Sequence, residues 1–167
     1  QNFVGYMAMR PGVEKRGSHG LFNEKDEPII LNQAANEIAE HKGNVWSHVV
    51  SLRREDAVRL GYDNSDAWRE LVKRHISDIA KAQNIPLCNL KWYAAYHDTT
   101  HHPHIHLLVY STNPKQGFLT KAGIDKIRSA FANDIFHDDL QSIYQEQTAS
   151  RDELKAVSKN EFESIVN

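Results

Sequence analysis

The sequence predicts an α+β fold in which an antiparallel β-sheet is flanked by helices. Three β-rich segments indicate the sheet, and stretches with helical apolar spacing lie before, between and after them. The resulting order, αβαββα with short links, favours an antiparallel sheet covered by helices. We expect about five strands in all, of which the sequence pattern locates three.

The first half of the chain predicts a loop, two helices and a strand. Residues 10–26 contain one proline and three glycines and are expected to form a long loop. A short helix is expected at 32–41, and the β-branched run WSHVVSLR predicts a strand at 46–53. The apolar residues of 66–83 recur at helical spacing, which makes this segment the clearest helix in the sequence.

The second half predicts a β-hairpin followed by a helix. The segments NLKWYAAYH and HIHLLVYS predict strands at 89–97 and 104–111. The six residues between them, 98–103, suit an antiparallel hairpin. A last helix is expected at 120–147, with its apolar residues at helical spacing.

Composition indicates one water-soluble domain over residues 1–167. The chain is 25% charged and 40% hydrophobic, with a mean hydropathy of −0.61, and it contains no apolar run of membrane-spanning length and no signal-peptide pattern. We therefore expect a cytoplasmic protein. The single Cys88 excludes an internal disulfide and a thiolate-rich zinc site. Because the chain begins at Gln1 rather than Met, we expect it to be a fragment of a longer protein.

Charge is distributed unevenly along the chain. The net charge is −2, but residues 134–167, an expected acidic helical segment, hold eight acids against three bases. The rest of the chain has a net charge of +3 and is compatible with a local phosphate-binding surface, although on charge alone a solvated surface of mixed charge is favoured. Its basic clusters are Arg10, Lys15 and Arg16; Arg53 and Arg54; and Lys121, Lys126 and Arg128.

Five of the ten histidines lie between His97 and His106. His104 and His106 are two residues apart on a predicted strand, so their side chains leave the same face, and the hairpin brings His97 beside them. Three neutral imidazoles can bind a divalent cation and leave coordination positions open for an anionic oxygen such as that of a phosphate. Asp98 is a candidate to orient an imidazole or to act as a base. His101 and His102 are expected in the turn.

Three segments together resemble a known family. The run YHDTTHHPHIHLLVYS resembles the signature motif of HUH endonucleases, in particular the plasmid mobilisation relaxases of the MobP/MobL type. YMAMRPGVEKRGSHGLF and WSHVVSLRRED are further matches, so the resemblance extends from Tyr6 to about Gln147. It implies an HUH-relaxase-like fold, with an antiparallel sheet and helices on one side.

The resemblance also implies a reaction. Relaxases nick one strand of plasmid DNA at an origin of transfer and later rejoin it, with a tyrosine of the N-terminal motif as the nucleophile, here Tyr6. The product is a 5′-phosphotyrosine and a free 3′-hydroxyl. A phenol is mostly protonated at neutral pH, so a metal ion and a base such as Asp98 or a histidine are expected to assist. Because some mobilisation relaxases use a histidine nucleophile, His19 is an alternative.

The same resemblance suggests the metal, the DNA contacts and the partners. The family uses Mg²⁺ or Mn²⁺, whereas three imidazoles suit Zn²⁺ or Ni²⁺, which we expect to be accepted in vitro; Mn²⁺ is the best compromise. The substrate is single-stranded DNA at an origin of transfer, in the bacterial cytoplasm, and accessory relaxosome proteins are expected partners. Candidate phosphate contacts are Arg10, Lys15, Arg16 and Arg53.

Two other functions fit parts of the sequence. His102, His104 and His106 also resemble the histidine-triad pattern of nucleotide hydrolases, in which the middle histidine is the nucleophile and no metal is needed. The HxD at His97 and the N-terminal RPG motif argue against this alternative, and a chelator separates the two because it stops only a metal-dependent relaxase. A third possibility is a DNA-binding module without catalysis.

Overall fold

A three-stranded antiparallel sheet organises the first part of the chain. The structure is a computed structural model that describes residues 2–166, and side chains as far as residue 162; Gln1 and Asn167, the ends of the expected domain, lie outside the described residues. Strands β1 (Val45–Ser51), β2 (Leu90–His97) and β3 (His104–Ser111) lie in the order β1-β3-β2. The three strands confirm the antiparallel sheet of the predicted α+β class.

The expectation of about five strands is not met by the described residues, which form three. The long loop over residues 10–30 contributes only two isolated bridges along the free edge of β2, Val13 with His97 and Phe22 with Ala94. Proline and glycines interrupt this loop, and Gly12 and Gly17 adopt positive φ angles of 94° and 97°. Such a backbone does not sustain a continuous ladder of strand hydrogen bonds.

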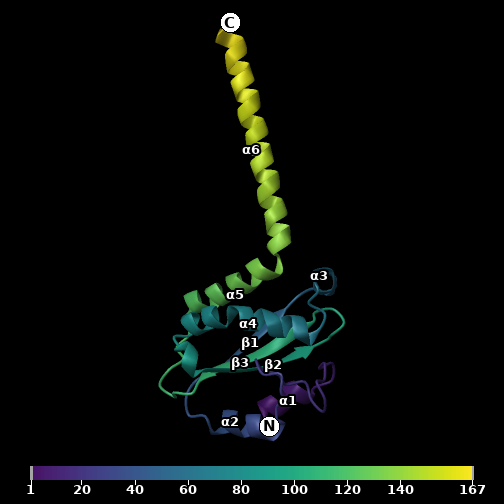
Figure 1. Ribbon diagram of the computed structural model, residues 1–167, viewed down its shortest axis with the longest axis vertical. Helices are drawn as coiled ribbons and strands as arrows, with labels where there is room; N and C mark the ends of the chain where they lie inside the picture. Colours follow the sequence, from purple (N-terminus) through teal and green to yellow (C-terminus); the bar gives the residue numbers. More distant parts are fainter. Residues whose placement is uncertain (1, 167) are drawn as a thin grey trace. The chain divides into compact units, whose positions relative to one another are not determined.

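Helices lie on both faces of the sheet (Figure 1). On one side are α1 (Phe3–Met9) and α2 (Leu31–Glu40), and on the other is α4 (Ser65–Ala82). The sequence pattern locates α2 and α4 to within one residue at each end but does not reveal α1. The short α3 (Arg54–Leu60) and the 3₁₀ turn η1 (Leu87–Asn89) lie in connections where no helix is predicted.

The two faces of the sheet bury different side chains. On the α4 face, the Trp68 ring stacks on Tyr96 with centroids 6.4 Å apart, and both side chains are fully buried. On the opposite face, Val4, Met7 and Ala8 of α1 pack in one cluster with Leu108 of β3. Alternate residues of each strand therefore contribute to separate cores.

The chain divides into two compact units, residues 1–131 and 132–167. The predicted helix 120–147 is in fact two helices, α5 (Lys121–Ile135) and α6 (His137–Val166), and the second continues well beyond the predicted end. The expected acidic segment, 134–167, falls within the second unit. Among the described residues, none of the helices has the length and apolar character required to cross a membrane.

Candidate metal centre

Three histidines meet on one face of the hairpin formed by β2 and β3. His97 lies directly opposite His104 in the strand register, and His106 follows two residues later on the same face. The ring centroids are 5.1 Å apart for His97 and His104, 4.8 Å for His97 and His106, and 5.1 Å for His104 and His106. One nitrogen from each ring lies within 4.8 Å of the others. The set predicted from the spacing is therefore brought together.

The ring nitrogens of this triad are mostly without protein partners. Both nitrogens of His97 and both of His106 are buried and form no hydrogen bond. His104 differs, because its Nδ1 lies 2.9 Å from the main-chain oxygen of His102. Donation from Nδ1–H to that carbonyl leaves the Nε2 lone pair free for a metal ion. Unpartnered buried nitrogens are costly unless a ligand uses them, so the donor set fits a bound cation.

The environment lowers the pKa of two histidines of the triad, His97 and His106. Burial, together with the charges of His106 and His104 and of Arg10, lowers the pKa of His97 to about 4. The main chain of Met7 raises the pKa of His97, although it does not form a hydrogen bond of normal geometry with the ring. Burial, His104 and Arg10 also lower the pKa of His106. Because a metal binds the neutral imidazole, these shifts favour ligation at neutral pH over protonation.

Helix α1 borders the triad and carries Tyr6. Phe3, one turn before Tyr6, meets the His106 ring edge-on with centroids 6.4 Å apart. The Tyr6 ring is 6.5 Å from the Phe3 ring, and the Arg10 guanidinium lies 5.4 Å from the centre of the Tyr6 ring. Tyr6 is 43% exposed. The structure thus places a solvent-accessible phenol on the helix next to the histidines.

The sheet is open beside the triad. Val49 of β1 lies opposite His106, and Ser51 lies opposite His104. Val49 is 60% exposed although it is apolar, and Ser51 is exposed as well. A substrate therefore has access to this face of the sheet from the β1 side.

Asp98 does not reach the histidines. Its carboxylate accepts a hydrogen bond of 2.6 Å from Arg54 and one of 3.5 Å from the Tyr96 hydroxyl. Tyr96 faces α4, whereas His97 faces α1, because successive strand residues point to opposite faces. The expected role of Asp98, orienting an imidazole or accepting a proton at the triad, has no contact in the structure to support it.

His19 is built into the fold. It is 6% exposed, its Nε2 lies 2.7 Å from the main-chain oxygen of Ile29, and its Nδ1 accepts a hydrogen bond of 3.0 Å from the Leu21 amide. Both ring nitrogens are therefore occupied in a structural role. This arrangement favours Tyr6 over His19 as the nucleophile.

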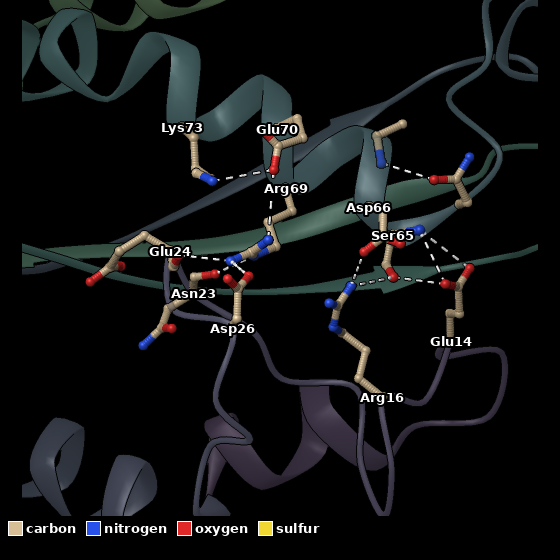
Figure 2. Close-up of polar contacts among 12 residues, drawn as sticks. Glu14, Arg16, Asn23, Glu24, Asp26, Ser65, Asp66, Arg69, Glu70 and Lys73 are labelled. Carbon is tan, nitrogen blue, oxygen red and sulfur yellow. Dashed lines mark hydrogen bonds and ion pairs between the residues drawn. The ribbon is translucent and has the colours of Figure 1, made fainter.

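Arg16 belongs to a polar network that attaches the loop over residues 10–30 to helix α4 (Figure 2). It donates to Ser65 Oγ at 3.1 Å and pairs with Asp66, while Glu14 accepts from the Ser65 hydroxyl at 2.7 Å. Further along the loop, the buried Arg69 donates to main-chain oxygens and to Asp26 at 2.8 Å. These contacts give Arg16 a structural role, and the expected phosphate contact stays a prediction.

Lys15 and Arg53 are exposed, and Arg10 is half-buried beside Tyr6.

Sequence reasoning missed two residues near the centre. Phe3 carries no sequence signal for its contact with His106, because α1 itself is not predicted. Arg54, which contacts the turn between His97 and His104, is visible in the sequence only as the second arginine of the segment WSHVVSLRRED.

The comparisons with known proteins agree with the family resemblance of the sequence motifs. A family model described as MobL relaxases matches residues 14–165. This range includes all three histidines and excludes Tyr6. No curated protein and no solved structure matches the chain.

Proposed function

Because the chain belongs to the MobL relaxase family, we propose that it nicks and rejoins one strand of DNA at a plasmid origin of transfer through a covalent phosphotyrosine. The family itself acts in DNA nicking during plasmid mobilisation, and relaxases of this kind generally use a divalent metal. The finer assignments, which are the metal ion, the nucleophile and the DNA contacts, are our proposal. The free thiol Cys88 is consistent with a bacterial cytoplasmic setting.

One observation carries the proposal. Three imidazoles converge on a sheet face that is open to solvent, and four of their nitrogens are buried without partners among the described residues. The helix beside them presents the exposed Tyr6. A cation site next to an accessible hydroxyl nucleophile suits phosphoryl transfer, because a cation offsets the charge that develops on the phosphate oxygens.

His97, His104 and His106 would hold the ion. When bound, a divalent cation supplies Lewis-acid stabilisation of the scissile phosphate, since three neutral ligands leave its charge uncompensated. We favour Mn²⁺, which accepts both imidazole and the oxygen of a phosphate; Mg²⁺ is the alternative, and Zn²⁺ or Ni²⁺ are candidates in vitro. The histidine-triad hydrolase alternative is less well supported, because His102 is exposed in the turn and His97 takes the third position.

The proposed step exchanges one phosphodiester for another. The Tyr6 oxygen bonds to phosphorus as its proton passes to water, and the bond from phosphorus to the 3′ oxygen breaks, so that this oxygen takes up a proton and leaves as a 3′-hydroxyl. The segment downstream of the nick remains on Tyr6 through its 5′ phosphate. Since the number of phosphodiester bonds is unchanged, the reverse attack by the 3′-hydroxyl rejoins the strand without an external energy source.

Single-stranded DNA is the proposed substrate, since a phosphate has to lie between Tyr6 and the histidines. Arg10 is the nearest candidate cation for a flanking phosphate, because its guanidinium lies against the Tyr6 ring. Lys15 and Arg53 are exposed and are further candidates. Accessory relaxosome proteins are proposed as partners at the same DNA.

The proposal is tested by trapping the covalent adduct. The chain is incubated with Mn²⁺ and single-stranded oligonucleotides that tile the transfer origin of a mobilisable plasmid, and a denaturing gel is examined for a shifted band. We expect an adduct that chelation prevents and that mass spectrometry of the DNA-linked peptide locates at Tyr6.

Two variants sharpen this test. Tyr6→Phe removes the nucleophilic oxygen and should abolish the adduct, whereas Tyr144→Phe, at an exposed tyrosine of α6, should leave it unchanged. An adduct that persists in Tyr6→Phe would move the nucleophile elsewhere. Binding of the oligonucleotide without any adduct would identify a DNA-binding module that does not cleave.

A further inference from the structure

The turn between His97 and His104, residues 98–103, is held by contacts from distant parts of the chain. On one side, the Asp98 amide donates to the Gly12 carbonyl at 2.8 Å. On the other side, the junction of β1 and α3 binds the turn through its main chain, because the Leu52 amide donates to Pro103 at 3.1 Å and the Arg54 amide to His101 at 3.0 Å. The two metal-ligand strands are therefore connected by a fixed segment.

The Arg54 side chain adds three hydrogen bonds to the start of this turn. Its Nε donates to the Thr100 carbonyl at 3.2 Å, and one terminal nitrogen donates to the Asp98 carboxylate at 2.6 Å and to the Thr99 carbonyl. A planar guanidinium can reach three acceptors in fixed directions, whereas an ammonium group on a flexible stem cannot. Because the ion pair with Asp98 is partly exposed, its main effect is on geometry rather than on net stability.

Thr99 is connected to His104 through the His102 carbonyl. Its hydroxyl donates to the His102 carbonyl at 2.7 Å, and the same carbonyl lies 2.9 Å from His104 Nδ1. That carbonyl fixes the proton on Nδ1 and thereby directs Nε2 toward His97 and His106. The position of the carbonyl depends in turn on Thr99, whose own backbone is held by Arg54.

We propose that Arg54 and Thr99 are positioning residues of the metal centre, which set the tautomer and orientation of His104 through the His102 carbonyl. The inference rests on the proposed function in that it assumes a cation on the three histidines. The proposal gives Arg54 a role other than DNA contact. Its neighbour Arg53, which is exposed, remains a candidate for DNA contact. Neither Arg54 nor Thr99 would touch the metal ion or the DNA.

The test measures Mn²⁺ binding in the absence of DNA, by electron paramagnetic resonance of free Mn²⁺ during a titration. Thr99→Val removes the hydroxyl and keeps the shape, and should weaken Mn²⁺ binding by about 10-fold, the lower end of what lost outer contacts to metal ligands cost. Thr99→Ser restores the hydroxyl and should stay within about 2-fold of the wild type. The absorption spectrum of bound Co²⁺ should change in Thr99→Val and remain as in the wild type in Thr99→Ser.

Arg54 is tested with a matched pair. Arg54→Ala should weaken Mn²⁺ binding by about 10- to 100-fold, and Arg54→Lys should resemble it, because charge without the planar fork does not hold the turn. Arg59→Ala removes the same charge from the same helix, at a residue that pairs with Asp56, and should bind Mn²⁺ as the wild type does. Thermal unfolding of each variant without metal verifies that it is folded.

The outcomes are distinguishable. Wild-type affinity in both Thr99→Val and Arg54→Ala would overturn the positioning role and leave the metal centre and the nicking reaction intact. Absence of Mn²⁺ and Co²⁺ binding by the wild type would overturn the metal centre and the positioning role together. An equal loss of Mn²⁺ affinity in Thr99→Val and Thr99→Ser would also overturn the positioning role, since the Thr99 hydroxyl would then be irrelevant.

Discussion

One face of the hairpin formed by β2 and β3 has two ends that treat buried polar groups in opposite ways. At one end lie His97, His104 and His106, with four ring nitrogens that have no partner. At the other end, Lys91, Tyr93 and Tyr110 all donate to one carboxylate, that of Glu37 on α2. The two ends are built from the same strands and face the same way.

The difference separates a ligand site from a structural contact. At the Glu37 end, burial, the charge of Glu37 and its hydrogen bond raise the pKa of Tyr93 to about 12, and the pKa of Tyr110 is also raised. Both hydroxyls therefore remain donors at any physiological pH, and the network attaches α2 to the sheet. At the histidine end each neutral ring has one acceptor nitrogen that no protein donor uses, and three such nitrogens close together are what a cation requires.

The largest expected effect is at the histidine end. His97→Leu removes a ligand and should reduce Mn²⁺ affinity by more than about 100-fold, because losing a direct ligand costs more than losing an outer contact. Nicking should be lost with it. The metal-free protein, however, should be at least as stable as the wild type, since two unpartnered buried nitrogens are replaced by apolar surface.

Metal titration, the adduct gel and chemical denaturation in the presence of a chelator check these three points. A large loss of metal-free stability in His97→Leu would show that His97 is a structural residue with a partner, and the contrast between the two ends would fail.

The Glu37 end should show the reverse behaviour. Glu37→Ala removes the acceptor that two buried tyrosine hydroxyls share and should lower the free energy of unfolding by about 3 kcal/mol, within the range for hydrogen bonds to charged groups and for unsatisfied buried donors. Mn²⁺ affinity should not change, because the Glu37 contacts belong to Lys91, Tyr93 and Tyr110. Chemical denaturation and the same Mn²⁺ titration measure both quantities; a parallel loss of metal affinity would show that the two ends are coupled.

How far the sequence predicts each end depends on the distance between the interacting residues. The triad is predictable because a spacing of two on one strand and a six-residue turn decide which faces and which neighbours the histidines have. The role of Glu37 is not, because it comes from a helix more than 50 residues before Tyr93 in the sequence. The same limit hides the contact between Arg54 and Asp98, 44 residues apart.

The helices also differ in how far the local sequence predicts them. Helix α4 is predicted because 18 residues of regular apolar spacing outweigh local ambiguity. Helix α1 has seven residues and includes Gly5. It depends on a cap in which the Val4 amide donates to the Asn2 side-chain oxygen at 3.1 Å, and on the burial of Met7 against the sheet. Isolated helices of this length are marginal, so tertiary packing decides that it forms. Tyr6 is therefore positioned by a helix that local sequence does not reveal.

The smallest expected effect is the pH dependence of stability at the Glu37 end. Burial disfavours the Glu37 carboxylate, but hydrogen bonds from Lys91, Tyr110 and Tyr93 outweigh it, so the pKa of Glu37 lies below its ordinary value of 4.5. A carboxyl with a lowered pKa in the folded state stabilises the protein above its unfolded pKa, and that contribution is lost as the pH falls through the folded pKa. Unfolding in denaturant should therefore show stability falling below about pH 5 in the wild type. In Glu37→Gln, which cannot ionise, this part of the decline should be absent, whereas a decline of equal size in both proteins would assign the acid sensitivity to other carboxyls.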